Sequence, residues 1–133
     1  MLLGVAPRSC FAFVRVEHVS RDRAKQLGVT IRSSLAGTNE VDVRLEFKTE
    51  GELKDFGRAI LDIGVASEGE SRVLSATVLP DRSTPDTVVV SFSADPKIMS
   101  KCVLTVMVRG GAQAKSDAYE FRMRDFIELQ NPR

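Results

Sequence analysis

A strictly alternating stretch runs Val41-Asp42-Val43-Arg44-Leu45-Glu46-Phe47-Lys48. Every odd-numbered residue in it is apolar, and every even-numbered residue is charged. Successive side chains of a β-strand point to opposite faces, so a period of two places one face on a core and the other in water. The stretch therefore predicts a strand in a sheet whose outer face is solvated.

Strand signals of the same kind recur along the chain, separated by turn residues. They predict strands at 11–18, 29–32, 41–48, 53–63, 72–79, 87–93, 102–109 and 118–129. Ser20 and Asp95 have the side chains of helix N-caps, and each begins a short stretch that favours a helical turn. The chain is thus expected to be mostly strand, with one or two short helical turns on its surface.

Many short strands with frequent turns are typical of an antiparallel two-sheet sandwich with an immunoglobulin-like or other Greek-key topology. A jelly roll or a flattened barrel is the alternative. The sequence lacks the regular strand–helix alternation of a doubly wound fold. We expect one all-β domain over 1–133, with flexible tails at 1–9 and 130–133.

Composition and charge limit the classes of partner. The 133 residues are 43% hydrophobic and 28% charged, which is ordinary for a globular domain. The formal net charge is +1, so no global field recruits nucleic acid or an anionic membrane. Cations are nevertheless concentrated in residues 1–32, which hold six of them against two acids. We expect neither nucleic-acid binding nor membrane insertion.

The first residues are apolar, but Pro7 and Arg8 end the run after Ala6. The run is too short for the core of a signal peptide or for a membrane span. The sequence therefore predicts neither segment. The compartment stays open, and a mature fragment of an exported protein is one alternative.

The chain has two cysteines, Cys10 and Cys102, each beside apolar residues. A structural disulfide between them is one interpretation, and two buried free thiols are the other. Neither cysteine belongs to a Cys-x-x-Cys or Cys/His spacing, so the sequence does not predict a zinc site.

No catalytic constellation is visible in the sequence. His18 is the single histidine, and it lies close to Ser20 and Asp22. A Ser-His-Asp triad is assembled from separate elements, which neighbours in one turn cannot reproduce. We therefore expect a protein without enzymatic activity and without a cofactor.

Four aspartates fall in predicted loops and are the only candidates for a calcium site: Asp81, Asp86, Asp95 and Asp117. Calcium requires six to eight converging oxygens, and the chain has no Asp-x-Asp cluster. Turn and cap roles are the competing interpretation of these residues. A ligand-binding or hydrolytic domain that uses loop carboxylates, with or without Ca²⁺, is the alternative function.

Tyr119 is the only tyrosine, and it begins the last predicted strand. In immunoglobulin-like sandwiches a tyrosine of this kind bonds a nearby loop backbone, which is called a tyrosine corner. Tyr119 is therefore a candidate structural residue.

With no site visible, the sequence favours a non-enzymatic β-sandwich module for protein–protein interaction or structural assembly. Strand edges are the surfaces that such a module can offer. We expect a protein partner, or self-association, through an edge strand; the identity of the partner stays open.

Overall fold

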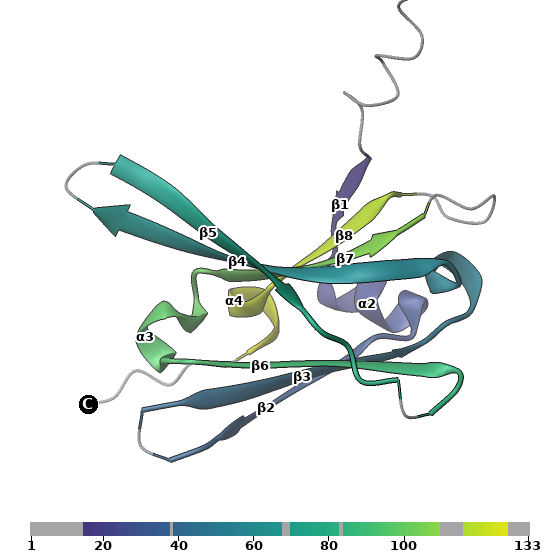
Figure 1. The fold of residues 1–133 in the computed structure, drawn as a ribbon, viewed down its shortest axis with the longest axis horizontal. Coiled ribbons are helices and arrows are strands. Elements are labelled where there is room, and N and C mark those ends of the chain that lie inside the picture. Colours follow the sequence, from purple (N-terminus) through teal and green to yellow (C-terminus); the bar gives the residue numbers. More distant parts are fainter. Residues whose placement is uncertain (1–14, 38, 68–69, 83, 110–115, 128–133) are drawn as a thin grey trace, which may run out of the picture.

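The computed structural model describes residues 15–37, 39–67, 70–82, 84–109 and 116–127. Two β-sheets form the fold, and short helices accompany them (Figure 1). The first sheet has the order β1-β8-β7-β4-β5, and its strands are Val16–His18, Ala118–Arg122, Cys102–Val108, Phe56–Ser67 and Glu70–Val78. The second has the order β2-β3-β6, and its strands are Thr30–Leu35, Val41–Lys48 and Thr87–Ala94.

Neighbouring strands are antiparallel, except that β1 pairs with β8 in parallel. The described helices are α2 (Arg21–Leu27), α3 (Pro96–Met99) and α4 (Met123–Phe126), together with the 3-10 turn η1 (Gly51–Leu53). The all-β two-sheet sandwich expected from the strand pattern is confirmed.

The alternating stretch forms β3 with the predicted bounds, Val41–Lys48. It lies between β2 and β6, so both of its edges are paired. Val43, Leu45 and Phe47 are buried, whereas Arg44 and Glu46 are exposed. The period of two thus separates the core face from the solvated face, as predicted.

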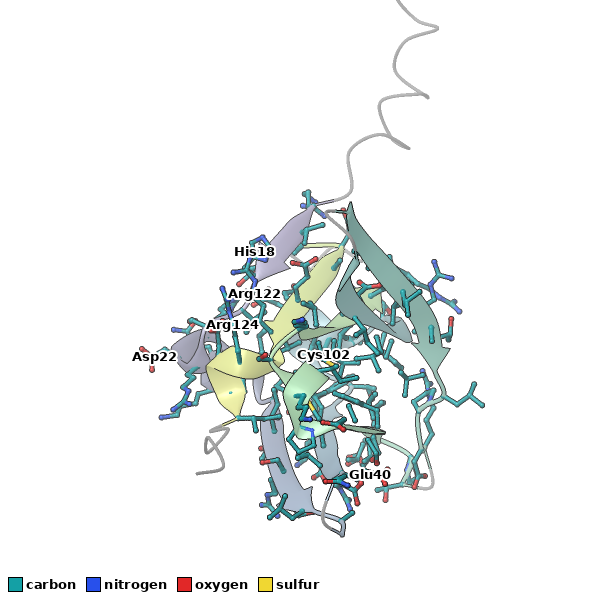
Figure 2. All side chains as sticks on the ribbon, turned by 90° about the vertical axis from the view of Figure 1, so that its left-hand side faces the viewer. His18, Asp22, Glu40, Cys102, Arg122 and Arg124 are labelled. Atoms are coloured by element: carbon teal, nitrogen blue, oxygen red, sulfur yellow. The ribbon has the colours of Figure 1, made fainter. Side chains whose placement is uncertain are left out.

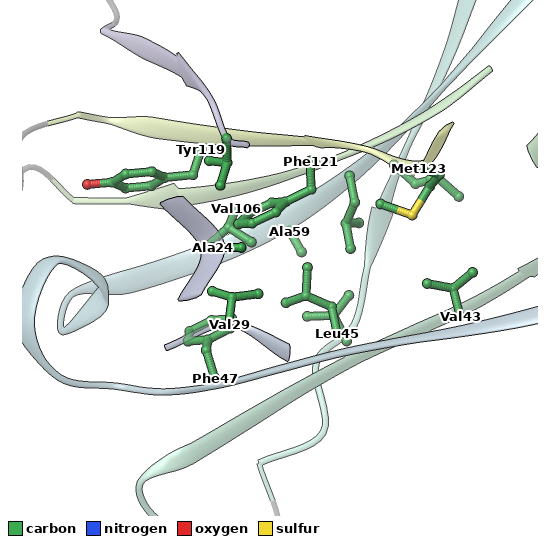
Figure 3. Packing of buried hydrophobic residues seen from close by; sticks show 14 of the residues in the cluster. Ala24, Val29, Val43, Leu45, Phe47, Ala59, Val106, Tyr119, Phe121 and Met123 are labelled. Atoms are coloured by element: carbon green, nitrogen blue, oxygen red, sulfur yellow. The ribbon is translucent and has the colours of Figure 1, made fainter. Parts of the chain in front are cut away.

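The core lies between the two sheets (Figure 3). Leu45 and Phe47 of β3 belong to one buried cluster with Ala59, Val106 and Phe121 of the five-stranded sheet. The rings of Phe47 and Phe56 meet edge to face, with centroids 5.3 Å apart. Aromatic pairs prefer this geometry, so the contact links β3 to the start of β4.

The predicted helical turns are confirmed, and their caps explain where they begin. Ser20 caps α2 by accepting a hydrogen bond from the Arg23 N–H, and Gly28 ends the helix with φ at 75°. Asp95 caps α3 by accepting from the Lys97 N–H at 2.8 Å. Both helices therefore begin at the residues that the sequence indicated.

The strand predicted at 118–129 is wrong in its second half. β8 ends at Arg122, and α4 follows directly. Met123 and Ile127 are both buried, whereas Asp125 is exposed. A strand would place Asp125 on the same face as Met123 and Ile127, and the helical turn rotates it into solvent. At the other end of the chain, the strand predicted at 11–18 is seen as β1, and residues 11–14 lie outside the described part.

Candidate interaction surface

β5 is an edge strand of the five-stranded sheet, since it pairs with β4 on one side and with no strand of the described chain on the other. Its residues from Val73 to Thr77 are all exposed. Val73 is 65% exposed and Leu74 is 55% exposed, although their side chains point to opposite faces of the strand. Both faces of β5 therefore meet solvent along this stretch.

The exposure follows from the unequal lengths of neighbouring strands. β4 pairs with β7 only as far as the Ile63–Cys102 pair, yet it continues to Ser67. The β4–β5 hairpin thus extends past the end of β7, and Figure 1 shows it diverging from the three-stranded sheet. Leu74 lies opposite Ile63 in this extension and shares its face. The predicted common face of Leu74, Ala76 and Val78 exists, but only Val78 packs against the core.

The backbone of β5 presents free hydrogen-bonding groups along its outer edge. The Gly64 N–H donates to the Lys101 carbonyl at 3.1 Å, so Gly64 directs its backbone groups away from β5. Gly64 and Val73 oppose each other across the β4–β5 pair, which makes them a non-hydrogen-bonded pair. Val73 therefore directs its N–H and C=O outward, and strand alternation gives Ser75 and Thr77 the same orientation.

This edge lacks the usual protection against strand addition. Proteins protect edges with charged residues, proline or β-bulges. Residues 73–79 contain no charge and no proline, and the β4–β5 register is continuous from Ala59–Val78 to Ser67–Glu70. One hydrogen bond, from the Ser75 hydroxyl to Asp62, ties this part of the edge to β4 through side chains.

The other edges of the two sheets are shorter or better protected. β1 has three residues. The edge of β6 is partly covered, because Asp81 and Val89 exchange backbone hydrogen bonds at 2.8 and 3.0 Å. β2 is six residues long and carries Arg32 near its middle. Among the described edges, that of β5 is the longest. Glu70 and Arg72 lie in its first part, and the rest, from Val73 to Val78, has no charge, no proline and no bulge.

The four loop aspartates do not gather into a site. Asp86 and Asp95 flank β6 at its two ends, and Asp95 is occupied as the α3 cap. Asp117 accepts hydrogen bonds from the backbone N–H of Arg15 at 3.0 Å and from its guanidinium Nε at 3.3 Å. That contact lowers the pKa of Asp117. Asp81 forms the backbone bridge to β6.

In the part of the chain that the structure describes, no three His, Cys, Asp or Glu side chains come close enough to hold a metal ion. The structure therefore does not bring Asp81, Asp86, Asp95 and Asp117 together into one cluster. Asp86 and Asp95 lie at opposite ends of β6, and Asp117 precedes β8 in the other sheet.

His18, Ser20 and Asp22 do not form a triad. The Nδ1 atom of His18 lies 2.6 Å from a Glu120 carboxylate oxygen and 3.3 Å from Arg122. Ser20 is occupied as the α2 cap, and Asp22 points into solvent (Figure 2). His18 is therefore a surface histidine at the end of β1 whose ring contacts Glu120 and Arg122.

Cys102 begins β7 and is buried, with a free thiol. Its Sγ contacts the Ile98 carbonyl at 3.5 Å, and burial raises the pKa of the thiol. A buried thiol of this kind is unreactive. Cys10 lies outside the described residues, so its pairing with Cys102 stays a prediction.

The Tyr119 ring is fully buried at one end of the core, and its hydroxyl points away from Phe121 (Figure 3). The hydroxyl donates to a Glu52 carboxylate oxygen at 2.9 Å. Burial, and then the bond to Glu52, raise the pKa of Tyr119 to about 12, although a backbone hydrogen bond from Ser116 opposes the shift. The tyrosine-corner hypothesis named a nearby loop backbone as the partner. The backbone of Ser116 fits that description, and the Glu52 carboxylate on η1 is a second partner that the hypothesis did not name.

Arg23 extends this contact into a network that sequence reasoning missed. Its guanidinium donates to Glu52 at 2.7 Å and to Glu17 at 2.6 Å, and Ser116 also donates to Glu17. The two carboxylates raise the pKa of Arg23. The network joins β1, α2, η1 and the loop before β8, so we interpret it as structural.

The sequence matches no protein-family model and none of the curated proteins with which it was compared. Among the described residues, no helix has the length and apolar character that crossing a membrane requires. The outer edge of β5 is therefore the candidate interaction surface of the described chain.

Proposed function

We propose that the chain is a non-enzymatic β-sandwich module that binds another protein by strand addition at the outer edge of β5. The observation that carries the proposal is an uncharged edge whose backbone groups at Val73, Ser75 and Thr77 face outward. An added strand gains main-chain hydrogen bonds there, and contacts of its alternating side chains supply selectivity. The exposed Val73 and Leu74 side chains offer apolar contacts on the two faces.

We also propose that the sandwich is immunoglobulin-like. The order β8-β7-β4-β5 corresponds to the G-F-C-C′ sheet of variable-type domains, and the β3–β6 pair corresponds to B–E. Tyr119 then lies on the G-like strand, one strand later than the tyrosine of a tyrosine corner. Variable-type domains continue this sheet with a C″ strand beside C′, whereas the described sheet ends at β5.

A synthetic peptide tests whether the edge accepts a strand. The probe carries the sequence of residues 72–79, flanked by lysines for solubility, and its binding is measured by fluorescence anisotropy. A scrambled peptide of the same composition is the control ligand. Wild-type protein is expected to bind the probe and not the scrambled peptide.

Ser75→Pro and Ser75→Ala form a matched pair of protein variants. Proline removes an N–H that points outward and not one that bonds β4, so the hairpin tolerates it as an edge substitution. Alanine removes the same hydroxyl and keeps the N–H. We expect Ser75→Ala to bind like wild type and Ser75→Pro to bind at least about tenfold more weakly. Undetectable binding by wild type at a concentration where it is monomeric, or equal binding by a folded Ser75→Pro, would overturn the proposal.

A further inference from the structure

We infer that the partner at this edge is a second copy of the chain, joined by antiparallel β5–β5 pairing about a two-fold axis at Ser75. The inference rests on the proposed strand addition and names the occupant. The pairing would continue the antiparallel order of the sheet through β4 and β5 into the same strands of the second copy.

The backbone register supports this axis. Val73, Ser75 and Thr77 direct their N–H and C=O groups outward. An axis at Ser75 places Val73 opposite Thr77 of the second copy and places the two Ser75 residues opposite each other. All of these positions are then hydrogen-bonded pairs, so every outward backbone group of the three residues gains a partner.

The charge pattern favours a copy of the chain as the occupant. No charged residue lies between positions 73 and 79, so two copies meet without like charges across the new strand pair. The nearest described acid is Asp62 on β4, and it accepts a hydrogen bond from Ser75. Three strand spacings, or about 14 Å, would separate the two Asp62 residues, which exceeds the Debye length at physiological salt.

β2 provides the contrast within the same molecule. Its edge is also exposed, but Arg32 lies near its middle. Antiparallel pairing of two β2 strands about an axis at Ser33 would place the two Arg32 side chains on one face as diagonal cross-strand neighbours, and like charges there are unfavourable. Antiparallel self-pairing is therefore favoured at the edge of β5 and disfavoured at the edge of β2.

The side-chain faces are also self-complementary. Leu74 lies opposite Ala76 of the second copy on the face that Ile63 shares, so the exposed apolar parts of two hairpins become continuous. Val73 lies opposite Thr77 on the other face, and cross-strand pairs of β-branched residues stabilise sheets. Pairing would thus cover part of the apolar surface that each hairpin exposes alone.

Sedimentation equilibrium over a range of concentrations tests the inference on the full chain of 14.6 kDa. Wild type and Ser75→Ala are expected to reach twice that mass, and Ser75→Pro is expected to remain monomeric. Circular dichroism and thermal melting establish that each variant is folded.

Charge reversal tests the register independently of proline. The double variant Val73→Lys/Thr77→Lys should be monomeric, because each lysine lies opposite another in the pair. Val73→Glu/Thr77→Glu should be monomeric for the same reason, and an equal mixture of the two should regain the doubled mass.

Two results would overturn the inference: a dimer that persists in Ser75→Pro, or a mixture of charge variants that stays monomeric. A wild-type chain that stays monomeric while it binds the 72–79 peptide would also overturn it. That last result would leave the proposed function intact and make the partner a different protein. Loss of peptide binding and of dimer together would contradict both.

Discussion

At the scale of single residues, the hydroxyl of Tyr119 belongs to a network of polar side chains. This hydroxyl and the Arg23 guanidinium share one Glu52 oxygen, and Arg23 also bonds Glu17. The partners are far apart in the chain: 67 residues separate Tyr119 from Glu52, and 29 separate Arg23 from Glu52. No local pattern could indicate these contacts, which explains why the sequence singled out Tyr119 without its partners.

Replacing Tyr119 with Phe should expose the contribution of the hydroxyl. The variant keeps the ring and loses the bond to Glu52, so we expect the free energy of unfolding at neutral pH to fall by about 1–2 kcal/mol. Urea denaturation measures the change. A difference below about 0.3 kcal/mol would contradict the role given to this bond.

The same variant has a distinctive pH dependence. Folding raises the Tyr119 pKa from the ordinary 10.0 to about 12, so the folded state holds the proton more tightly than the unfolded state. The resulting stability is present below pH 10 and is lost as the pH rises toward 12. Tyr119 is the only tyrosine, so its ionisation can be followed by ultraviolet absorbance. The difference in the free energy of unfolding between wild type and Tyr119→Phe should decrease as the pH rises from 10 toward 12. A difference that stays constant would contradict this expectation.

At the scale of elements, the local sequence pattern predicts where a strand forms, but it does not predict which of the strand's faces are covered by other elements. The bounds and the two faces of β3 followed from alternation alone, because β3 is paired on both sides and buried on one face. β5 was predicted at 72–79 with Leu74 and Ala76 on one face, yet both are exposed. Alternation states which residues share a face, and only the packing of the other sheet decides whether that face is covered.

Substitutions on the two faces of β3 test this difference. Leu45 is fully buried, so Leu45→Ala should lower the free energy of unfolding by about 2–5 kcal/mol through lost burial and a cavity. Glu46 is exposed and forms an ion pair with Arg44 at 3.3 Å, so Glu46→Ala should change the free energy of unfolding by less than about 0.5 kcal/mol. Chemical denaturation of both variants provides the comparison. Similar effects at the two positions would contradict the assignment of the faces.

At the scale of the whole molecule, composition and strand spacing predicted a single all-β sandwich. They did not predict the strand order, because β4 pairs with β7 and β8 pairs with β1 across long distances in the chain. The candidate surface was predicted only as an unspecified edge strand. Which edge is free depends on strand order and relative length, since the β4–β5 hairpin is exposed only where it extends past β7.

The function proposed for this fold depends on one geometric feature, the outward backbone groups of β5. Hydrogen exchange of individual amides, followed by NMR on protein dilute enough to be monomeric, measures that feature directly. In the free protein the amides of Val73, Ser75 and Thr77 should exchange faster than those of Leu74, Ala76 and Val78, which face β4.

Saturation with the 72–79 peptide is the decisive step of that measurement. We expect exchange at Val73, Ser75 and Thr77 to slow by at least about tenfold, while exchange at the amides of β2 is unchanged. Unchanged exchange at these three positions, or protection that appears on β2 instead, would contradict the assignment of the β5 edge as the binding surface.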